Sequence, residues 1–242
     1  VSTPILYFST FSLCPNGIMI TGSHNPGNYN GLKIVENKKT ISGDAIQKIR
    51  DSVLEKEFLK GKGSEKEIEV KDKYLESILK NIELKRPIRL AIDCGNGAAG
   101  VIAEEVYKGL GCEVHSLFSE VDGNFPNHHP DPSKSENLQD LQQLVADKNL
   151  EIGLAFDGDA DRLGVVSKKG KIIFPDMQMI LFSNSVLKQN KGGKIVFDVK
   201  CSKLLSDAIE SQGGTPIMSK TGHSYIKKCI YEEKALLGGE MS

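Results

Sequence analysis

The chain has 242 residues, of which 39% are hydrophobic and 26% charged, and its formal net charge is −1. This length allows two compact domains or one large one, and the composition is ordinary for a globular protein. The near-zero charge gives no electrostatic argument for nucleic acid or an anionic membrane, and no apolar run approaches the roughly 20 residues of a membrane-spanning helix. We therefore expect no nucleic-acid or membrane partner.

The first 63 residues predict a helix, two strands and a second helix. Thr3-Pro4 is typical of a helix start, and the apolar run after it predicts a helix to about Phe11. Strands are expected at 17–21 and 32–35, separated by a Gly/Asn/Pro-rich loop at 22–31, the serine loop. Ser42 is expected to cap a charged amphipathic helix that ends near Leu59.

From residue 70 onward, helices and strands alternate. Helices are predicted at 71–82, 98–110, 136–148, 175–189, 202–212 and 223–233, and strands at 89–93, 113–118, 152–156, 194–199, 216–219 and 235–238. Residues 164–174 are typical of a hairpin, whereas 122–133 predict an irregular loop rich in Gly, Asn, His and Pro, the histidine loop. The fold class predicted is α/β, with consecutive three-layer α/β domains and mixed, mostly parallel sheets.

Five cysteines are widely spaced, and no two of them form a CxxC pair: Cys14, Cys94, Cys112, Cys201 and Cys229. A zinc ribbon or a redox dithiol is therefore not expected. Scattered free thiols are typical of a reducing compartment, so we expect a cytoplasmic protein.

The serine loop places a hydroxyl beside an imidazole. Ser23 and His24 follow a strand end, where α/β sheets expose reactive groups, and Lys33 lies close by in the sequence. His24 could exchange a proton with a substrate hydroxyl, and Lys33 could act near a developing charge. An ordinary turn is the alternative, because Ser, Asn, Gly and Pro are turn residues in any case.

A second string, Asp157-Gly-Asp-Ala-Asp-Arg162, follows a wholly apolar strand and is called the aspartate loop. In an extended loop its three alternate carboxylates point the same way and repel each other unless a cation joins them. Hard oxygen ligands favour Mg²⁺ or Ca²⁺, and the EF-hand pattern fails because Arg162 and Lys168 stand where Gly and Glu would be needed. A solvated acidic turn remains the alternative.

Gly95-Asn-Gly-Ala-Ala-Gly100, the glycine loop, has the dinucleotide-binding spacing, with Glu120 about 20 residues on. The alternative is a tight turn that needs small residues for close packing. Lys220 and His223 precede a helix, and Lys200 ends a strand, so these groups could hold an anion. Single lysines are nevertheless usually solvated.

In combination, these strings resemble the α-D-phosphohexomutase superfamily, most closely its bacterial phosphomannomutase/phosphoglucomutase branch, along the whole chain. Residues 17–26 and 30–33 resemble its phosphoserine loop, and 157–162 resemble its metal loop. Residues 198–200 and 220–223 resemble its substrate-side elements, and 239–242 resemble the start of its sugar-binding loop.

The resemblance implies that Ser23 carries a phosphoryl group and that Mg²⁺ is held by Asp157, Asp159, Asp161 and a phosphoserine oxygen. It also implies that His24 and Lys33 serve proton transfer and that Arg162 holds the phosphoserine. The residues implied to approach the substrate are Lys200, Lys220, His223, Glu240 and Ser242.

The implied reaction interconverts hexose 1-phosphate and hexose 6-phosphate through a 1,6-bisphosphosugar, with glucose 1,6-bisphosphate as activator. Met241 favours glucose and mannose phosphates over glucosamine phosphate, and a monomer or weak dimer is expected. Three parts of the family's fold are expected here: the end of domain 1 at 1–63, domain 2 at 64–170 and most of domain 3 at 171–242. A fragment without domain 4 is expected to have little mutase turnover.

Two other functions remain open from the sequence. A haloacid-dehalogenase-like phosphatase would use Asp157 as nucleophile, although it leaves the serine loop without a role. An NAD-dependent oxidoreductase would use the glycine loop.

Overall fold

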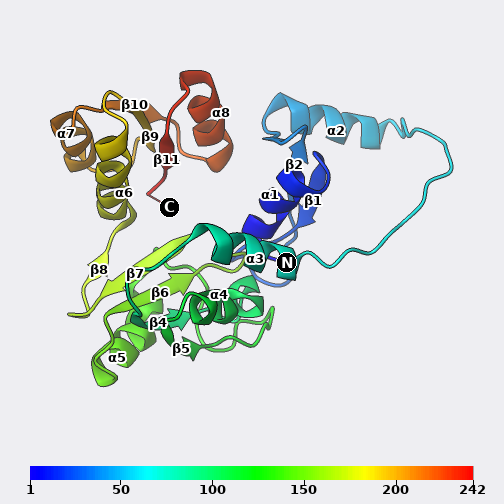
Figure 1. The fold of residues 1–242 in the computed structure, drawn as a ribbon. Helices are drawn as coiled ribbons and strands as arrows, with labels where there is room; N and C mark the ends of the chain where they lie inside the picture. The colour runs from blue at the N-terminus through cyan, green and yellow to red at the C-terminus, as the bar shows by residue number, and fades with distance from the viewer. Residues whose placement is uncertain (242) are drawn as a thin grey trace.

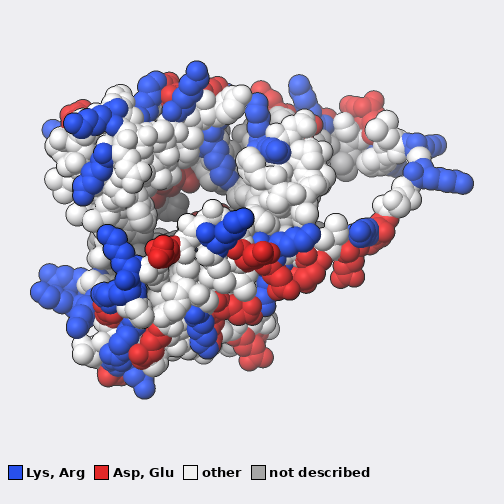
Figure 2. Space-filling view, in the orientation of Figure 1, with Lys and Arg blue, Asp and Glu red and all other residues white. Residues whose placement is uncertain are grey.

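The computed structural model describes residues 1–241, which form three α/β units, each built around its own sheet. Figure 1 shows the middle unit below, with the first unit above it on one side and the third unit above it on the other. Basic and acidic side chains are interspersed over the face seen in Figure 2, in keeping with the near-zero net charge. None of the described helices is long and apolar enough to cross a membrane.

The first unit has an antiparallel three-stranded sheet of order β1-β2-β3. Its elements are α1 (Thr3–Ser12), β1 (Gly17–Ile20), β2 (Leu32–Glu36), β3 (Lys39–Thr40) and α2 (Asp44–Leu54). The expectation of mostly parallel strands is wrong for this sheet, because the serine loop joins neighbouring strands directly without a crossover helix. The expected Ser42 cap is also wrong, since Gly43 precedes α2 and no side chain caps it.

The middle unit has a five-stranded sheet of order β5-β4-β6-β7-β8, in which β5, β4 and β6 are parallel, β7 is antiparallel to β6, and β8 is antiparallel to β7. Its elements are α3 (Lys71–Asn81), β4 (Arg89–Asp93), η1 (Ala98–Val101), α4 (Ala103–Gly109), β5 (Glu113–Leu117), η2 (Ser135–Leu138), α5 (Gln139–Asp147), β6 (Ile152–Phe156), β7 (Leu163–Ser167) and β8 (Ile172–Ile173). The helix expected at 98–110 is divided at Ile102 into a 3-10 turn and a short α-helix.

Two apolar clusters cover the two faces of this middle sheet. Ile92 and Leu154 belong to one cluster, and their neighbours Ala91 and Ala155 belong to the other. Successive side chains of a strand point to opposite faces, so β4 and β6 are buried on both sides. This double burial places the polar residues that follow β4 and β6 at one edge of a rigid sheet.

The third unit has a parallel sheet of order β10-β9-β11. Its elements are α6 (Pro175–Gln189), β9 (Lys194–Asp198), α7 (Lys203–Ser211), β10 (Thr215–Ser219), α8 (His223–Glu233) and β11 (Leu237–Gly239). The last strand begins two residues later than the 235–238 expected. Because the three strands run the same way, the segments after them, including Lys200, Lys220 and Glu240, start from the same edge of the sheet.

Candidate active site

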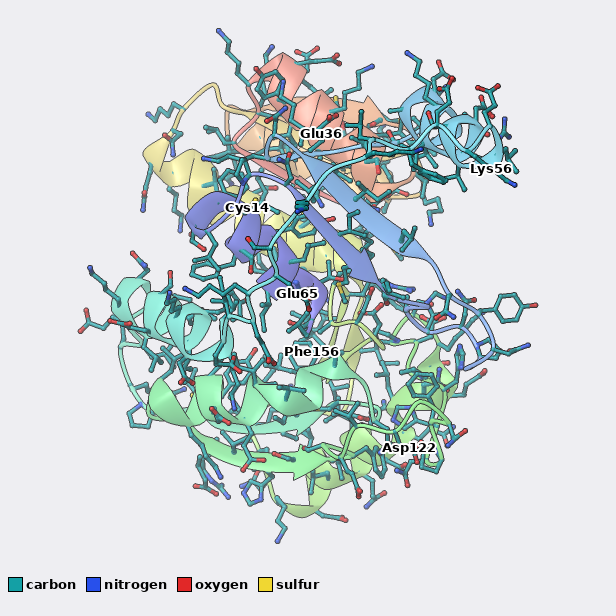
Figure 3. All side chains as sticks on the ribbon, turned by 90° about the vertical axis from the view of Figure 1, so that its right-hand side faces the viewer. Cys14, Glu36, Lys56, Glu65, Asp122 and Phe156 are labelled. Atoms are coloured by element: carbon teal, nitrogen blue, oxygen red, sulfur yellow. The ribbon has the colours of Figure 1, made fainter. Side chains whose placement is uncertain are left out.

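The serine loop is a tight excursion that presents Ser23. The Thr21 amide donates to the Gly31 carbonyl at 3.0 Å and closes the loop. Ser23 itself has a positive φ of 51°, and its amide donates to the Thr21 hydroxyl oxygen at 2.8 Å. In Figure 3 the loop that follows β1 descends from the first unit toward the middle unit, whose Phe156 lies at the junction between the two.

The aspartate loop meets the serine loop backbone to backbone at Gly158. A Cβ atom at Gly158 would lie 2.1 Å from the Ser23 carbonyl oxygen, so only glycine allows this approach. Asp157 and Asp159 on either side of it are almost completely buried. The close contact explains how residues about 134 positions apart in the chain share one site.

Three side chains surround the Ser23 hydroxyl. Ser23 Oγ donates to Asp157 Oδ2 at 3.0 Å and lies 3.2 Å from His24 Nδ1. Arg162 Nη2 donates to Ser23 Oγ at 3.3 Å, and the Arg162 guanidinium also contacts His24 and Asp157. A hydroxyl oxygen with a carboxylate, an imidazole and a guanidinium around it can carry a phosphoryl group.

The three carboxylates of the aspartate loop converge as the sequence predicts. Asp157, Asp159 and Asp161 each offer one oxygen, and these oxygens lie within 4.8 Å of one another. Asp159 Oδ2 accepts hydrogen bonds at 3.0 Å from Thr3 and Thr21, whereas Asp159 Oδ1 is buried and has no hydrogen-bond partner among the described residues. An orphaned buried carboxylate oxygen beside two others fits a hard divalent cation.

Charge is distributed unevenly among these groups. Burial and the neighbouring Asp161 raise the pKa of Asp157 to about 6, although Arg162 opposes the shift. Burial would also raise the pKa of Asp159, but its hydrogen bond to Lys33 lowers that pKa below the ordinary value. Lys33 Nζ lies 2.7 Å from Asp159 and 2.6 Å from Asp161, and these hydrogen bonds outweigh burial and raise the pKa of Lys33. Lys33 is therefore a persistent cation at the aspartates.

His24 behaves differently from Lys33. Burial and the Arg162 guanidinium lower the pKa of His24 below its ordinary value. The imidazole is therefore neutral near pH 7 and can accept a proton.

A cleft of about 880 Å³ opens over this cluster and is bounded by all three units. Ser23, His24, Lys33, Asp161 and Arg162 line one side of it, and His223, Glu240 and Met241 line the other. The hollow between the units is visible in Figure 2. Such a cleft has the size of a small-molecule site.

The expected substrate residues are placed unevenly. Glu240 accepts a hydrogen bond from the Gly222 amide, and burial raises its pKa. His223 Nδ1 is buried and has no hydrogen-bond partner in residues 1–241, and burial lowers the pKa of this residue. Lys220 is exposed, and neither Lys200 nor Lys220 is among the lining residues of the cleft. Lys200 Nζ lies 3.9 Å from Asp198, and Ser242 lies outside the described residues.

Three residues that hydrogen-bond to the site residues from other parts of the chain were not predicted from the sequence. Thr3, expected only as a helix start, donates its amide to the Asp159 carbonyl and its hydroxyl to the Asp159 carboxylate. Thr21 connects the serine loop to the same carboxylate, and Asp131 accepts from Arg162 at 3.4 Å. The Thr contacts span more than 100 residues and the Asp131 contact spans 31, and a lone Thr or Asp carries no sequence signal for such contacts, although Thr21 stands next to the motif.

The glycine loop supports the aspartate loop from below. The Ala98 amide donates to the Gly158 carbonyl at 2.9 Å, and a Cβ at Gly97 would lie 2.8 Å from that oxygen. A Cβ at Gly100 would lie 2.0 Å from the Ser119 carbonyl oxygen. These contacts favour close packing as the reason for the glycines.

Comparison with known proteins agrees with this architecture. Models of phosphoglucomutase/phosphomannomutase alpha/beta/alpha domains I, II and III match residues 1–60, 72–170 and 174–242. A phosphoglucomutase of Neisseria gonorrhoeae is 53% identical, and the match covers 100% of this chain and 53% of that protein. A phosphomannomutase/phosphoglucomutase of Pseudomonas aeruginosa is 48% identical over 100% of this chain and 52% of that protein.

A solved structure leads to the same family. The crystal structure of a phosphoglucomutase/phosphomannomutase family protein from Burkholderia thailandensis has a TM-score of 0.95 and 46% identity, and covers 100% of this chain and 55% of that chain. The chain thus spans about half the length of the relatives it matches. The predicted fold class and resemblance are confirmed, and the chain belongs to the phosphoglucomutase/phosphomannomutase family.

Proposed function

We propose that this chain carries the phosphoryl-transfer centre of a phosphohexomutase, which interconverts hexose 1-phosphate and hexose 6-phosphate of mannose or glucose. The observation that carries the proposal is the meeting of Ser23 Oγ with Asp157 at 3.0 Å and Arg162 at 3.3 Å, across two units and beside a cleft. The named activities of the Neisseria and Pseudomonas relatives support the substrate class.

The metal proposed is Mg²⁺, with Asp157, Asp159, Asp161 and a phosphoserine oxygen on Ser23 as its ligands. The oxygen-only donor set and the orphaned Asp159 Oδ1 support this choice. When bound, the ion neutralises charge on the phosphoryl oxygens. Lys33 forms ion pairs with Asp161 and Asp159, and we propose that, as a cation at this place, it serves proton transfer together with His24.

The chain's residues suit a reversible transfer. The free hydroxyl of the sugar phosphate attacks the phosphorus on Ser23, an O–P bond forms, the P–Oγ bond breaks, and Oγ gains the proton that the hydroxyl loses. His24 Nδ1, 3.2 Å from Oγ, is placed to carry that proton, and Arg162 holds the phosphoryl oxygens. After the 1,6-bisphosphosugar reorients, Oγ attacks its other phosphate and the steps reverse. Glucose 1,6-bisphosphate would load Ser23 as the activator.

The far side of the cleft would hold the sugar phosphate. We propose that His223 and Glu240 contact it from the third unit, with Lys200 and Lys220 contributing at the same sheet edge. Ser242, which lies outside the described residues, is proposed as a further contact from the resemblance alone. Met241, also in the lining, would favour glucose and mannose phosphates. We further propose boundaries at 63/64 and 170/171, a cytoplasmic location, and a monomer or weak dimer.

Loading of the protein with phosphate tests the proposal. The chain is incubated with glucose 1,6-bisphosphate and Mg²⁺, and the modified residue is located by peptide mass spectrometry. We expect phosphate on Ser23, its loss in Ser23→Ala, and its retention in Ser12→Ala, whose side chain is exposed and donates to the Phe8 carbonyl. Phosphate on Asp157 would instead support a haloacid-dehalogenase-like phosphatase and overturn the mutase proposal.

A further inference from the structure

The histidine loop, residues 122–133, lies against the active site, but the proposed chemistry uses none of its residues. It is pinned to the glycine loop at several points. Asn127 Nδ2 donates to Asn96 Oδ1 at 2.7 Å, and the Asp122 amide donates to the Asn96 carbonyl at 3.0 Å. A Cβ at Gly95 would lie 3.0 Å from Pro130 Cβ, so Pro130 packs directly on the turn. Figure 3 shows Asp122 at the edge of the middle unit.

The central contact is an ion pair between His128 and Asp93. His128 Nε2 lies 3.0 Å from Asp93 Oδ2, and His128 Nδ1 lies 3.0 Å from the His129 carbonyl oxygen. Both partners are acceptors, so both ring nitrogens carry protons and the ring is positively charged. In agreement, the hydrogen bond to Asp93 raises the pKa of His128 despite burial.

Both carboxylate oxygens of Asp93 accept hydrogen bonds, one from His128 and one from the turn beside it. Its side chain is 1% exposed, and its second oxygen accepts the Gly95 amide at 2.9 Å. The His128 ring also packs edge-on against Phe118, with ring centroids 5.2 Å apart. A buried ion pair with every oxygen bonded is costly to break from one side.

The residues that follow His128 touch the catalytic side chains. The His129 ring lies edge-on to the His24 ring, with centroids 5.7 Å apart and an interplanar angle of 85°. Asp131 Oδ1 accepts from Arg162 Nη1 at 3.4 Å and is fixed in turn by the Ser133 hydroxyl at 2.7 Å. The loop thus supports His24 and Arg162, two of the three side chains that contact Ser23 Oγ.

We propose that Asp93 and His128 are positioning residues: their ion pair fixes the histidine loop so that His129 and Asp131 hold His24 and Arg162 against Ser23. Only the catalytic consequence rests on the proposed function. The contact between the His129 and His24 rings can be measured without any assay of activity.

The geometry is tested in the full 242-residue chain with His128→Gln. Histidine side chains are labelled with ¹³C, and the chain has only five of them, so each can be assigned. In the unmodified protein we expect a nuclear Overhauser effect between the His24 and His129 rings. We expect it to disappear in His128→Gln and to persist in His115→Gln, a matched control that breaks the exposed pair of His115 with Glu113. Its persistence in His128→Gln would overturn the proposal.

Asp93→Asn provides a second variant should His128→Gln fail to fold, because it keeps the shape of the side chain while it removes the charge and turns one acceptor oxygen into a donor NH₂ group. The same loss of the His24–His129 signal is expected. An unchanged signal in a folded Asp93→Asn protein overturns the proposal in the same way.

The catalytic consequence is measured as the rate at which Ser23 is phosphorylated by glucose 1,6-bisphosphate. We expect about a tenfold slower rate in His128→Gln, because small misplacements of catalytic groups are costly. In a His129→Ala, Asp131→Asn background, His128→Gln should slow the reaction no further. Equal slowing in both backgrounds would mean that His128 does not act through these residues, and would overturn the proposal. Failure of the unmodified chain to phosphorylate Ser23 would count against the proposed function, while the ring contact would still decide the positioning.

Discussion

The aspartate loop and the glycine loop begin at equivalent places. Each follows a buried parallel strand of the middle sheet, β6 and β4, and a buried aspartate stands at each strand end: Asp157 directly after β6, and Asp93 as the last residue of β4. Both oxygens of Asp93 have donors, namely the Gly95 amide and His128. In the aspartate loop, by contrast, Asp159 keeps one buried oxygen without a partner. Position at a sheet edge therefore does not distinguish the two loops. Asp157 and Asp93 both have donors on both oxygens, and the unpartnered oxygen of Asp159 is what sets the aspartate loop apart.

The two loops are also coupled. The glycine loop donates the Ala98 amide to the Gly158 carbonyl, and Gly158 in turn lies against Ser23. The aspartate loop therefore provides side-chain oxygens, and the glycine loop holds the backbone of the aspartate loop in place. A dinucleotide-type glycine pattern serves packing in this protein.

The largest expected effect is on metal binding. Asp159→Asn should weaken Mn²⁺ binding by about 100-fold, because the orphaned oxygen loses its charge and ligand charge sets affinity. Asp93→Asn should change it far less, since both Asp93 oxygens are already used. Free Mn²⁺ measured by electron paramagnetic resonance gives both affinities. Equal losses in the two variants would break the distinction between the loops.

Next in size is the effect of a methyl group at the contact between the loops. Gly158→Ala should destabilise the protein by about 1–3 kcal/mol, because the added carbon would lie 2.1 Å from the Ser23 carbonyl oxygen and something must shift. Gly63→Ala, where nothing lies within 4 Å, is the matched control. Urea unfolding at equal protein concentration measures the difference, and equal midpoints and slopes for the two variants would show that the contact is not tight.

A smaller effect is expected from a change of pH, which should alter the affinity for Mn²⁺. The pKa of Asp157 is raised to about 6 in the folded protein, so its proton stays on through mildly acidic pH and must leave when a cation binds. Without metal, the stability contributed by this group is complete below the ordinary aspartate pKa and is lost as pH rises through about 6. Mn²⁺ affinity should consequently fall about tenfold between about pH 7 and pH 5. Calorimetric titration at both values checks this, and a constant affinity would contradict it.

The smallest expected effect is none at all. NADH added to the protein should show no saturable change in nicotinamide fluorescence, because the glycines that would receive a pyrophosphate are packed against Gly158, Ser119 and Pro130. Saturable binding that Gly97→Ala removes would instead support the dinucleotide interpretation of the glycine loop.

Most of the candidate catalytic and metal-binding side chains could be predicted from the sequence, but few of the residues that hold them in place could. The alternation of Asp157, Asp159 and Asp161 after an apolar strand was enough to predict that their carboxylates converge. The contacts of Thr3 and Asp131 could not be predicted, because they depend on how distant segments pack. The role of Lys33 also depends on packing, since two aspartates from another unit hold its ammonium.

The secondary structure predicted from local sequence was wrong where contacts between distant segments determine the backbone conformation. The helix expected through 98–110 breaks at Ile102, after the close approach of Gly100 to Ser119. The first sheet is antiparallel because its strands are joined without a crossover. By contrast, α8 (His223–Glu233) was predicted to the residue, since its apolar positions and left-handed end at Lys234 agree with a regular helix.

The most direct test of the central claim, that the serine and aspartate loops form one metal-bridged centre, is to locate Mn²⁺ by anomalous scattering in crystals of the protein. We expect one strong peak within ligand distance of Asp157, Asp159 and Asp161 and next to Ser23. A peak bound by exposed carboxylates elsewhere, or no peak at these three residues in the presence of saturating Mn²⁺, would contradict it.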